Sequence, residues 1–320
     1  MSNEMDDLQT RVNRIGQTLG QVIVGQTKVI DQLLVALLAG GHLILEGVPG
    51  TGKTLTVKAM AHLIQTEFCR IQLTPDILPS DILGTNIFDL NTRSFELKKG
   101  PVFTQVLLAD EINRTPPKTQ AALLEAMEEQ QVTLDGTGWP LPDFFWVIAT
   151  QNSLEFEGTY PLPEAQLDRF LFKLVVDYPE AEAEKQMLTN AQAGFEAKQL
   201  NLKSLQPLAT AEQVLAARQA VKKITVQEPI LDYLLGLVRK TRQSPDLALG
   251  ASPRSAVNWL RASKAHAWLK GQSYVTPDNV KAVAKPLLRH RLILGPEAQL
   301  DGLTVDAVIK TILEQVVVPR

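Results

Sequence analysis

The stretch HLILEGVPGTGKT, residues 42–54, decides the fold of this 320-residue chain. Its opening apolar run predicts a buried strand, and the apolar spacing after residue 54 predicts a helix. Between them, residues 47–54 match the pattern of Gly, four residues and Gly-Lys-Thr. In a strand–loop–helix context this pattern is typical of a loop whose backbone N–H groups bind phosphate.

The loop has the chemistry that a nucleoside triphosphate requires. Its glycines let backbone N–H groups approach phosphate oxygens closely, and the start of the following helix adds a partial positive charge. Lys53 can reach the β- and γ-phosphates, and the Thr54 hydroxyl can bind Mg²⁺. We therefore predict ATP and Mg²⁺ as cofactors. The residues assigned to the nucleotide are Gly47, Val48, Pro49, Gly50, Thr51, Gly52, Lys53, Thr54 and Leu55.

Further apolar runs follow at 68–73, 106–109, 144–149 and 171–176, with helical patterns between them. Short apolar strands that alternate with helices predict an α/β domain with a five-stranded parallel sheet. From about residue 180 helical periodicity dominates, and helices are expected at 182–193, 211–223, 229–242, 253–269, 277–290 and 305–316. We place the boundary near Pro179, with an α/β domain over 1–179 and a smaller all-α domain over 180–320.

Two adjacent carboxylates, Asp110 and Glu111, end the apolar strand at 106–109. Ligands gather at the strand tips of a parallel α/β sheet. We assign Asp110 to Mg²⁺, through its water shell, and Glu111 to orienting and polarising the attacking water. Acid pairs also cap helices. The position of this pair in the sequence, after the phosphate loop and one intervening strand, favours the catalytic role.

Three further polar residues stand at positions that suit nucleotide chemistry. Asn152 follows the strand at 144–149 and could contact the γ-phosphate and the attacking water, or serve only in a turn. Arg169 precedes the fifth strand and could pair with a local acid or reach a neighbouring subunit's nucleotide. Arg254 lies near the start of a helix in the second half, where an arginine could project onto phosphates or remain solvated.

Charge and hydropathy exclude several classes of protein. The net charge is −3, and since a surface that follows nucleic-acid phosphates needs clustered Lys and Arg, nucleic acid is not an expected partner. No apolar run approaches the length of about 18 residues that a membrane span needs. Residues 1–14 lack the basic flank and apolar core of a signal peptide. We therefore expect a cytoplasmic protein without a membrane span.

Taken together and in order, these motifs resemble the MoxR family of AAA+ ATPases over nearly the whole chain. The segments that carry the resemblance are IVGQ (23–26), the phosphate loop, DEINR (110–114), PKTQ (117–120), LLEAME (123–128) and YPLPEAQLDRF (160–170). The resemblance implies an AAA+ core, an all-α lid domain and assembly into a homo-oligomeric, hexameric ring. It also implies that Val24, Gly25 and Gln26 form the adenine-side box.

The resemblance assigns roles to single residues as well. Asp110 and Glu111 are similar to the Walker B acids of the family and Asn152 to its sensor 1 residue. Arg169 resembles the arginine finger and Arg254 the sensor 2 arginine. Family membership further implies two inserted hairpins, which we expect near 74–103 and 131–143. Long connections of this kind are usually functional, so contact with a substrate or partner is favoured over ordinary surface loops.

The resemblance leaves more than one function open. The leading hypothesis is ATP-driven, chaperone-like remodelling or maturation of a protein partner, such as one with a von Willebrand factor A domain. A nucleic-acid motor would need a basic hairpin tip, and Arg93, Lys98 and Lys99 are offset by Asp89 and Glu96. A metal-chelatase-type ATPase subunit is a third reading, and a nucleotide-binding scaffold without activity a fourth.

Overall fold

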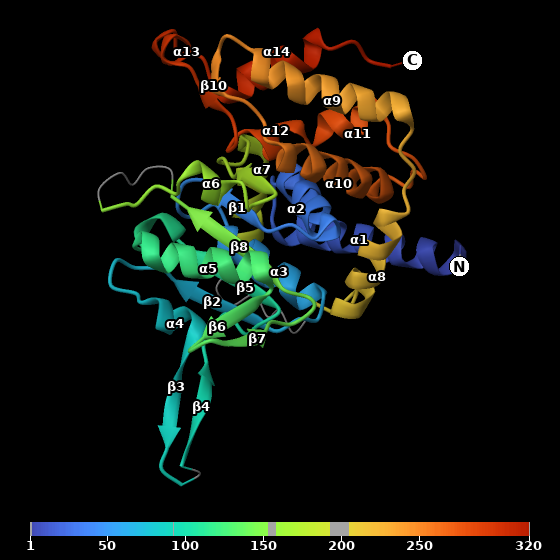
Figure 1. Ribbon diagram of the computed structural model, residues 1–320. Helices are drawn as coiled ribbons and strands as arrows, with labels where there is room; N and C mark the ends of the chain where they lie inside the picture. Colours follow the sequence, from blue (N-terminus) through green and yellow to red (C-terminus); the bar gives the residue numbers. More distant parts are fainter. Residues whose placement is uncertain (1, 92, 153–157, 193–204, 320) are drawn as a thin grey trace.

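A parallel sheet forms the centre of the molecule, with strand order β2-β5-β8-β1-β9 (Figure 1). The computed structural model describes residues 2–91, 93–152, 158–192 and 205–319. The strands are β1 (Leu43–Glu46), β2 (Phe68–Gln72), β5 (Val106–Asp110), β8 (Trp146–Gln151) and β9 (Phe172–Val175). The predicted five-stranded parallel sheet is therefore confirmed.

Helices cover both faces of this sheet. Side chains of a strand alternate between faces, so Leu43 and Leu45 pack into one hydrophobic cluster and Ile44 into the other. The first cluster includes residues of α1 (Ser2–Val22), α2 (Thr27–Ala39) and α3 (Lys53–Leu63). The second includes residues of α4 (Pro79–Leu83) and α5 (Pro117–Glu129). The strands β1, β5 and β8 are buried on both sides, which explains why their sequences show little polar alternation.

The register of the sheet defines two opposite edges. Leu43 pairs with Phe172 at the start of β1, and Glu46 pairs with Gln151 and Val175 at its end. All five strands run in the same direction, so the segments that follow β1, β5 and β8 meet at one edge, which we call the carboxyl edge. His42 and the turn at 168–171, which precedes β9, lie at the other, the amino edge.

Two antiparallel hairpins interrupt the core. One consists of β3 (Gly84–Asp89) and β4 (Ser94–Lys99), and the other of β6 (Gln131–Leu134) and β7 (Thr137–Pro140). Figure 1 shows the first hairpin projecting away from the body of the protein. Gly84 allows the two strands to approach closely at the base of this hairpin, because a Cβ there would lie 2.3 Å from the carbonyl oxygen of Lys98. Asn86 Nδ2 donates to Asp135 Oδ2 over 2.6 Å and so joins the two hairpins.

The second half of the described chain is mainly helical. Its elements are α7 (Ala181–Gln192), α8 (Ala211–Lys222), α9 (Glu228–Gln243), β10 (Leu247–Leu249), α10 (Pro253–Leu269), α11 (Pro277–Ala282), α12 (Ala284–Leu288), β11 (Ile293–Leu294), α13 (Pro296–Leu300) and α14 (Val305–Gln315). The hydroxyls of Thr210, Ser252 and Thr276 cap α8, α10 and α11 by accepting from backbone N–H groups. We call the part from α9 to α14 the lid. Among the described residues, no helix is both long and apolar enough to cross a membrane.

One helix expectation was wrong. The sequence predicted a continuous helix over 277–290, but α11 ends at Ala282 and α12 begins at Ala284. Pro286 supplies the reason, because a proline ring inside a helix clashes with the carbonyl group four residues earlier, here that of Ala282.

The lid docks on the core through α10, which packs against α2.

Candidate nucleotide site and two paired arginines

The phosphate loop leaves the carboxyl edge of the sheet after β1. Gly47 N–H donates to the carbonyl oxygen of Gln151 over 3.3 Å, which ties the loop to β8. A Cβ on Gly47 would lie 2.2 Å from the carbonyl oxygen of Val176, so only glycine fits. Gly50 and Gly52 both have φ +83°, and a Cβ on either would meet nothing within 4 Å. The loop therefore presents an open cradle of backbone at the start of α3.

Lys53 folds back over this cradle. Its Nζ donates to the carbonyl oxygens of Gly47 and Val48 over 2.5 and 2.8 Å. Burial lowers the pKa of Lys53, while the charges of Asp110 and Glu111 raise it in part. A cation with neutral carbonyl partners beside an open backbone cradle fits the terminal phosphates of a nucleotide. Thr54 follows it, half-buried, in the first turn of α3.

A cavity of about 570 Å³ adjoins the loop, a size typical of small-molecule sites. Of the predicted nucleotide residues, those that line it are Val24, Gln26, Gly50, Thr51, Gly52 and Leu55. Tyr178, Met187 and Leu188 also line it, and each is exposed. Gln26 Nε2 donates to the carbonyl oxygen of Asp177 over 2.8 Å, and Gly25 has φ +83° close to Pro179. A flat apolar base could enter between this segment and α7.

A threonine that the sequence analysis missed orders the two acids. Thr150 Oγ1 donates to Asp110 Oδ1 over 3.0 Å and accepts from Glu111 N–H over 2.9 Å. Asp110 is buried, and its other oxygen accepts from Arg70 Nε over 2.5 Å. The hydroxyl at the end of β8 was a weak signal in the sequence, because threonine is common in strands.

Glu111 has a backbone conformation that few non-glycine residues adopt. Its φ is 60° and its ψ 51°, just before the short 3₁₀ helix η1 (Ile112–Arg114). Such strain persists where the surroundings enforce it, and it is typical of functional sites. Arg114 Nη1 lies 3.3 Å from Glu111 Oε2. Asn152 directly follows β8, which pairs with β1, the strand that leads into the phosphate loop. Asp110, Glu111, Thr150 and Asn152 therefore all lie at the carboxyl edge.

Arg169 and Arg254 lie elsewhere. Both pair with one carboxylate: Arg169 Nε lies 3.0 Å from Glu128 Oε2, and Arg254 Nη2 lies 2.6 Å from Glu128 Oε1. A separate cavity of about 290 Å³ is lined by both arginines and by His42, Glu128, Asp168 and Arg261. Neither arginine lines the nucleotide cavity.

The amino edge of the sheet explains this separation. Arg169 sits between α6 (Glu164–Leu167) and the start of β9, beside the beginning of β1. The phosphate loop follows the other end of β1. Arg169 therefore cannot share the nucleotide cavity of its own subunit, and the docked lid brings Arg254 to the same edge.

His42 is a buried residue that also lines this second cavity. Its Nδ1 accepts from Val147 N–H over 2.9 Å, so Nε2 carries the proton and donates to the carbonyl oxygen of Met127 over 3.3 Å. Burial lowers its pKa to about 4, and the charges of Arg218 and Arg261 act in the same direction. The imidazole is therefore neutral at physiological pH and adds no charge to the cavity that the arginines line.

The sheet order, the phosphate loop, the acids at the adjacent strand and the helical lid define an AAA+ fold. Residues 42–172 match the model of the ATPase family associated with various cellular activities (AAA), and residues 239–312 match the AAA lid domain. The chain is 41% identical to the chaperone MoxR1 of Mycobacterium tuberculosis over 94% of this chain and 80% of the relative. It is 31% identical to the MoxR protein of Paracoccus denitrificans over 98% of both chains.

A solved structure agrees with these matches. A protein from Cytophaga hutchinsonii superposes with a TM-score of 0.89 at 40% identity, over 100% of this chain and 98% of that one. The chain belongs to the MoxR family of AAA+ ATPases, as the motifs indicated.

Proposed function

We propose that this chain hydrolyses ATP at the contact between neighbouring subunits of a ring, and that hydrolysis drives remodelling or maturation of a protein partner. One observation carries the first part. The phosphate loop and both acids occupy the carboxyl edge of the sheet, whereas Arg169 and Arg254 occupy the amino edge and line a different cavity. An active site with arginines then requires a second subunit, whose amino edge faces the first subunit's nucleotide.

Each residue has a defined task in this proposal. The backbone of residues 47–52 and Lys53 hold the triphosphate, while Val24 and Gln26 contact the base side. Thr54 and Asp110 supply the oxygen ligands of a hydrated Mg²⁺, which when bound neutralises charge on the β- and γ-phosphates. Glu111 accepts a proton from the attacking water, and Asn152 orients that water. Arg169 and Arg254 of the neighbour stabilise the charge that develops on the transferred phosphoryl group.

Exposed apolar side chains favour a protein partner over nucleic acid. On the first hairpin Phe88, Leu90 and Phe95 are 48%, 82% and 72% exposed. A segment that bound nucleic-acid phosphates would instead present clustered cations. The relative that is named a chaperone also favours a protein partner. A ring of six subunits and a partner with a von Willebrand factor A domain remain proposals from the family resemblance.

Mixing two inactive variants tests the shared site. Arg169→Ala retains Glu111, and Glu111→Gln retains Arg169, so a mixed ring contains some contacts with both groups intact. We expect each variant alone to bind ATP and to hydrolyse it poorly, by a factor of about 10³ or more for the arginine. Phosphate release should return in part on mixing. Arg239→Ala, an exposed arginine of α9, is the control and should behave as the wild type.

An inactive mixture would overturn the shared site if native mass spectrometry detects mixed oligomers. Light scattering offers an independent check, because ATP should promote assembly of Glu111→Gln. The partner is tested separately by using Glu111→Gln as an ATP-bound trap in cell extract. Recovery of DNA in place of protein would contradict the proposed protein partner and leave the shared site intact.

A further inference from the structure

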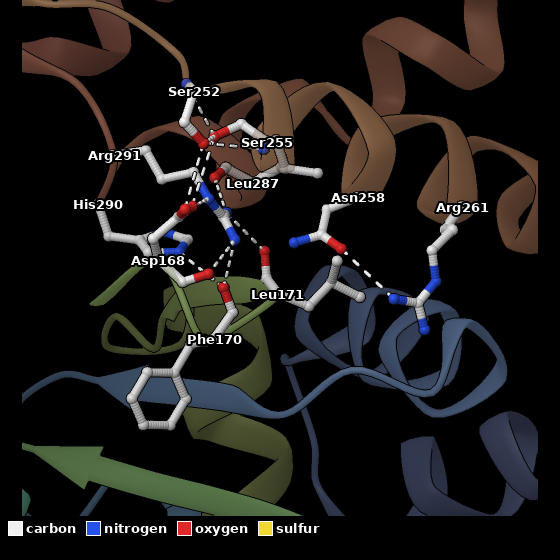
Figure 2. A network of polar contacts seen from close by, with 10 residues as sticks. All are labelled: Asp168, Phe170, Leu171, Ser252, Ser255, Asn258, Arg261, Leu287, His290 and Arg291. Atoms are coloured by element: carbon white, nitrogen blue, oxygen red, sulfur yellow. Dashed lines mark hydrogen bonds and ion pairs between the residues drawn. The ribbon is translucent and has the colours of Figure 1, made fainter. Parts of the chain in front are cut away.

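One buried guanidinium, that of Arg291, binds the turn at 168–171, in which Arg169 lies. Figure 2 shows Arg291 beside Asp168, Phe170 and Leu171. The Arg291 side chain is 2% exposed, and Nε donates to Asp168 Oδ1 over 2.6 Å. Nη2 donates to the carbonyl oxygens of Asp168 and Phe170, and Nη1 to that of Leu171 over 2.9 Å. Nη1 also donates to the Leu287 carbonyl oxygen in α12. The residues on both sides of Arg169 are therefore fixed to the lid.

The carboxylate of Asp168 extends the same network to Arg254. Ser252 Oγ donates to Asp168 Oδ2 over 3.2 Å, and Ser255 Oγ lies 3.4 Å from Oδ1. Ser252 is the N-cap of α10, and its hydroxyl accepts from Ser255 N–H over 3.0 Å. Arg254 lies between these two serines, in the first turn of α10. Figure 2 shows the serines, Asp168 and Arg291 converging on one point.

We infer that Arg291 is a positioning residue that sets the joint orientation of Arg169 and Arg254, and so acts on the neighbouring subunit's nucleotide without contacting it. This inference rests on the proposed function and adds a residue to it. The planar guanidinium has its donors in a fixed fork, so contacts with one carboxylate and several carbonyl groups define a single geometry. A lysine would keep the charge beside Asp168 but could not reproduce that fork.

The expected effect is on the chemical step. Misplacement of a catalytic group by about 1 Å costs a factor of about 100 in rate, even when the change lies far from the reacting atoms. Nucleotide binding should change little, because Lys53 and the phosphate loop lie at the opposite edge of the sheet. A purely structural role for Arg291 predicts the reverse: losses of stability, assembly and nucleotide binding together.

Steady-state kinetics of Arg291→Lys give the first test. We expect kcat to fall about 100-fold while KM for ATP changes by less than about threefold. Arg289→Lys is the matched control. Arg289 lies two residues before Arg291 and pairs with Asp306 over 2.8 Å, so its substitution should leave kcat unchanged. Asp168→Asn, which keeps the shape of the carboxylate, should reproduce the kcat effect. Wild-type kcat in both Arg291→Lys and Asp168→Asn would overturn the inference.

Rings mixed from two variants give the second test. They show whether Arg291 affects the site of its own subunit or the site to which its subunit donates arginines. Arg291→Lys subunits should regain activity with Glu111→Gln subunits, which donate both arginines, but not with Arg169→Ala subunits, which donate Arg254 without Arg169. In a random mixture about one contact in four has the productive order. If Arg291→Lys stays inactive with Glu111→Gln while Arg169→Ala regains activity with it, the positioning role of Arg291 is refuted and the shared site is not. Failure of Arg169→Ala as well would refute the shared site and the inference together.

Discussion

The guanidinium of Arg169 lies 3.0 Å from the carboxylate of Glu128 in the same subunit. Arg254 binds the other oxygen of that carboxylate, so one acid in α5 gathers two arginines that are distant in sequence. A carboxylate and a phosphate present similar oxygen acceptors to an arginine fork. Under the proposed function, Glu128 would therefore compete with the neighbouring subunit's γ-phosphate for both arginines.

Glu128→Gln should make ATP-dependent assembly easier. The amide keeps the shape of the side chain but removes the negative charge that competes with phosphate. We expect half-maximal assembly at a protein concentration a few times lower, a change typical of one partly exposed ion pair. Light scattering against protein concentration measures this midpoint. An unchanged or higher midpoint would contradict the competition, and Glu125→Gln, exposed on the same helix, serves as the control.

Lys53→Ala should weaken ATP binding by at least about tenfold, because the triphosphate loses a charge-assisted hydrogen bond that contributes about 1.5–3 kcal/mol. Folding should be retained, since the two hydrogen bonds of Nζ go to loop carbonyl oxygens that water can also solvate. Isothermal titration of the variant with ATP and Mg²⁺ measures the change. Lys58→Ala, exposed on the same helix, should bind as the wild type does. Unchanged affinity of Lys53→Ala would remove the loop from nucleotide binding.

Thr150→Val should damage both catalysis and stability. The variant keeps the shape of the side chain but leaves Asp110 without one donor and Glu111 N–H without its acceptor. An unsatisfied buried polar group costs about 1–3 kcal/mol, so the melting temperature should fall. We expect kcat to fall about tenfold, because Glu111 is no longer fixed. Thr311→Val, an exposed threonine of α14, is the control, and equal kcat in both variants would show that Thr150 does not order the acids.

His42 predicts a loss of stability in mild acid. The unfolded chain takes up a proton at this residue below its ordinary pKa of 6.5, whereas burial delays protonation in the folded chain to a pKa of about 4. The stabilisation is complete above pH 6.5 and is lost as the pH falls from 6.5 to 4, by about 3 kcal/mol in all. His290 is also buried with a lowered pKa and acts in the same direction.

Melting temperatures between pH 7.5 and 4.5 test this prediction. His42→Gln can still donate to the carbonyl oxygen of Met127 but takes up no proton. The variant should therefore show a smaller fall in melting temperature than the wild type over this range. An identical slope for both proteins would exclude His42 as a source of the acid sensitivity.

Local patterns were enough to predict most of the fold. The phosphate loop, the five strands and most helices depend on residues close together in sequence, so periodicity and the glycine spacing identified them. The break before α12 was missed, although Pro286 was visible, because helical periodicity continues on both sides of it. The candidate site follows from the same local patterns, since Lys53 and Thr54 begin α3 directly after the phosphate loop, and Asp110 and Glu111 lie at the end of β5. Their roles in nucleotide chemistry stay predictions.

The arrangement at the amino edge was not predictable in this way. Glu128 looks like an ordinary charge on a helix, and Arg291 like one just after a helix. Only the tertiary fold brings Glu128 to Arg169, and only the docking of the lid brings Arg254 to Glu128 and Arg291 to Asp168. The sequence favoured no particular side of the sheet for Arg254. Contacts between residues so far apart depend on packing of whole elements, and one chain without its relatives carries no local signal of them.

The opposite edges of the sheet give the assembly a direction. Under the proposed function each subunit depends on the neighbour on one side and serves the neighbour on the other, as in any head-to-tail ring. A subunit that has lost both its acids and its arginines therefore silences two sites, its own and the one it serves. The activity of a ring poisoned with such subunits would follow the square of the intact fraction, so a minority of damaged chains has a disproportionate effect.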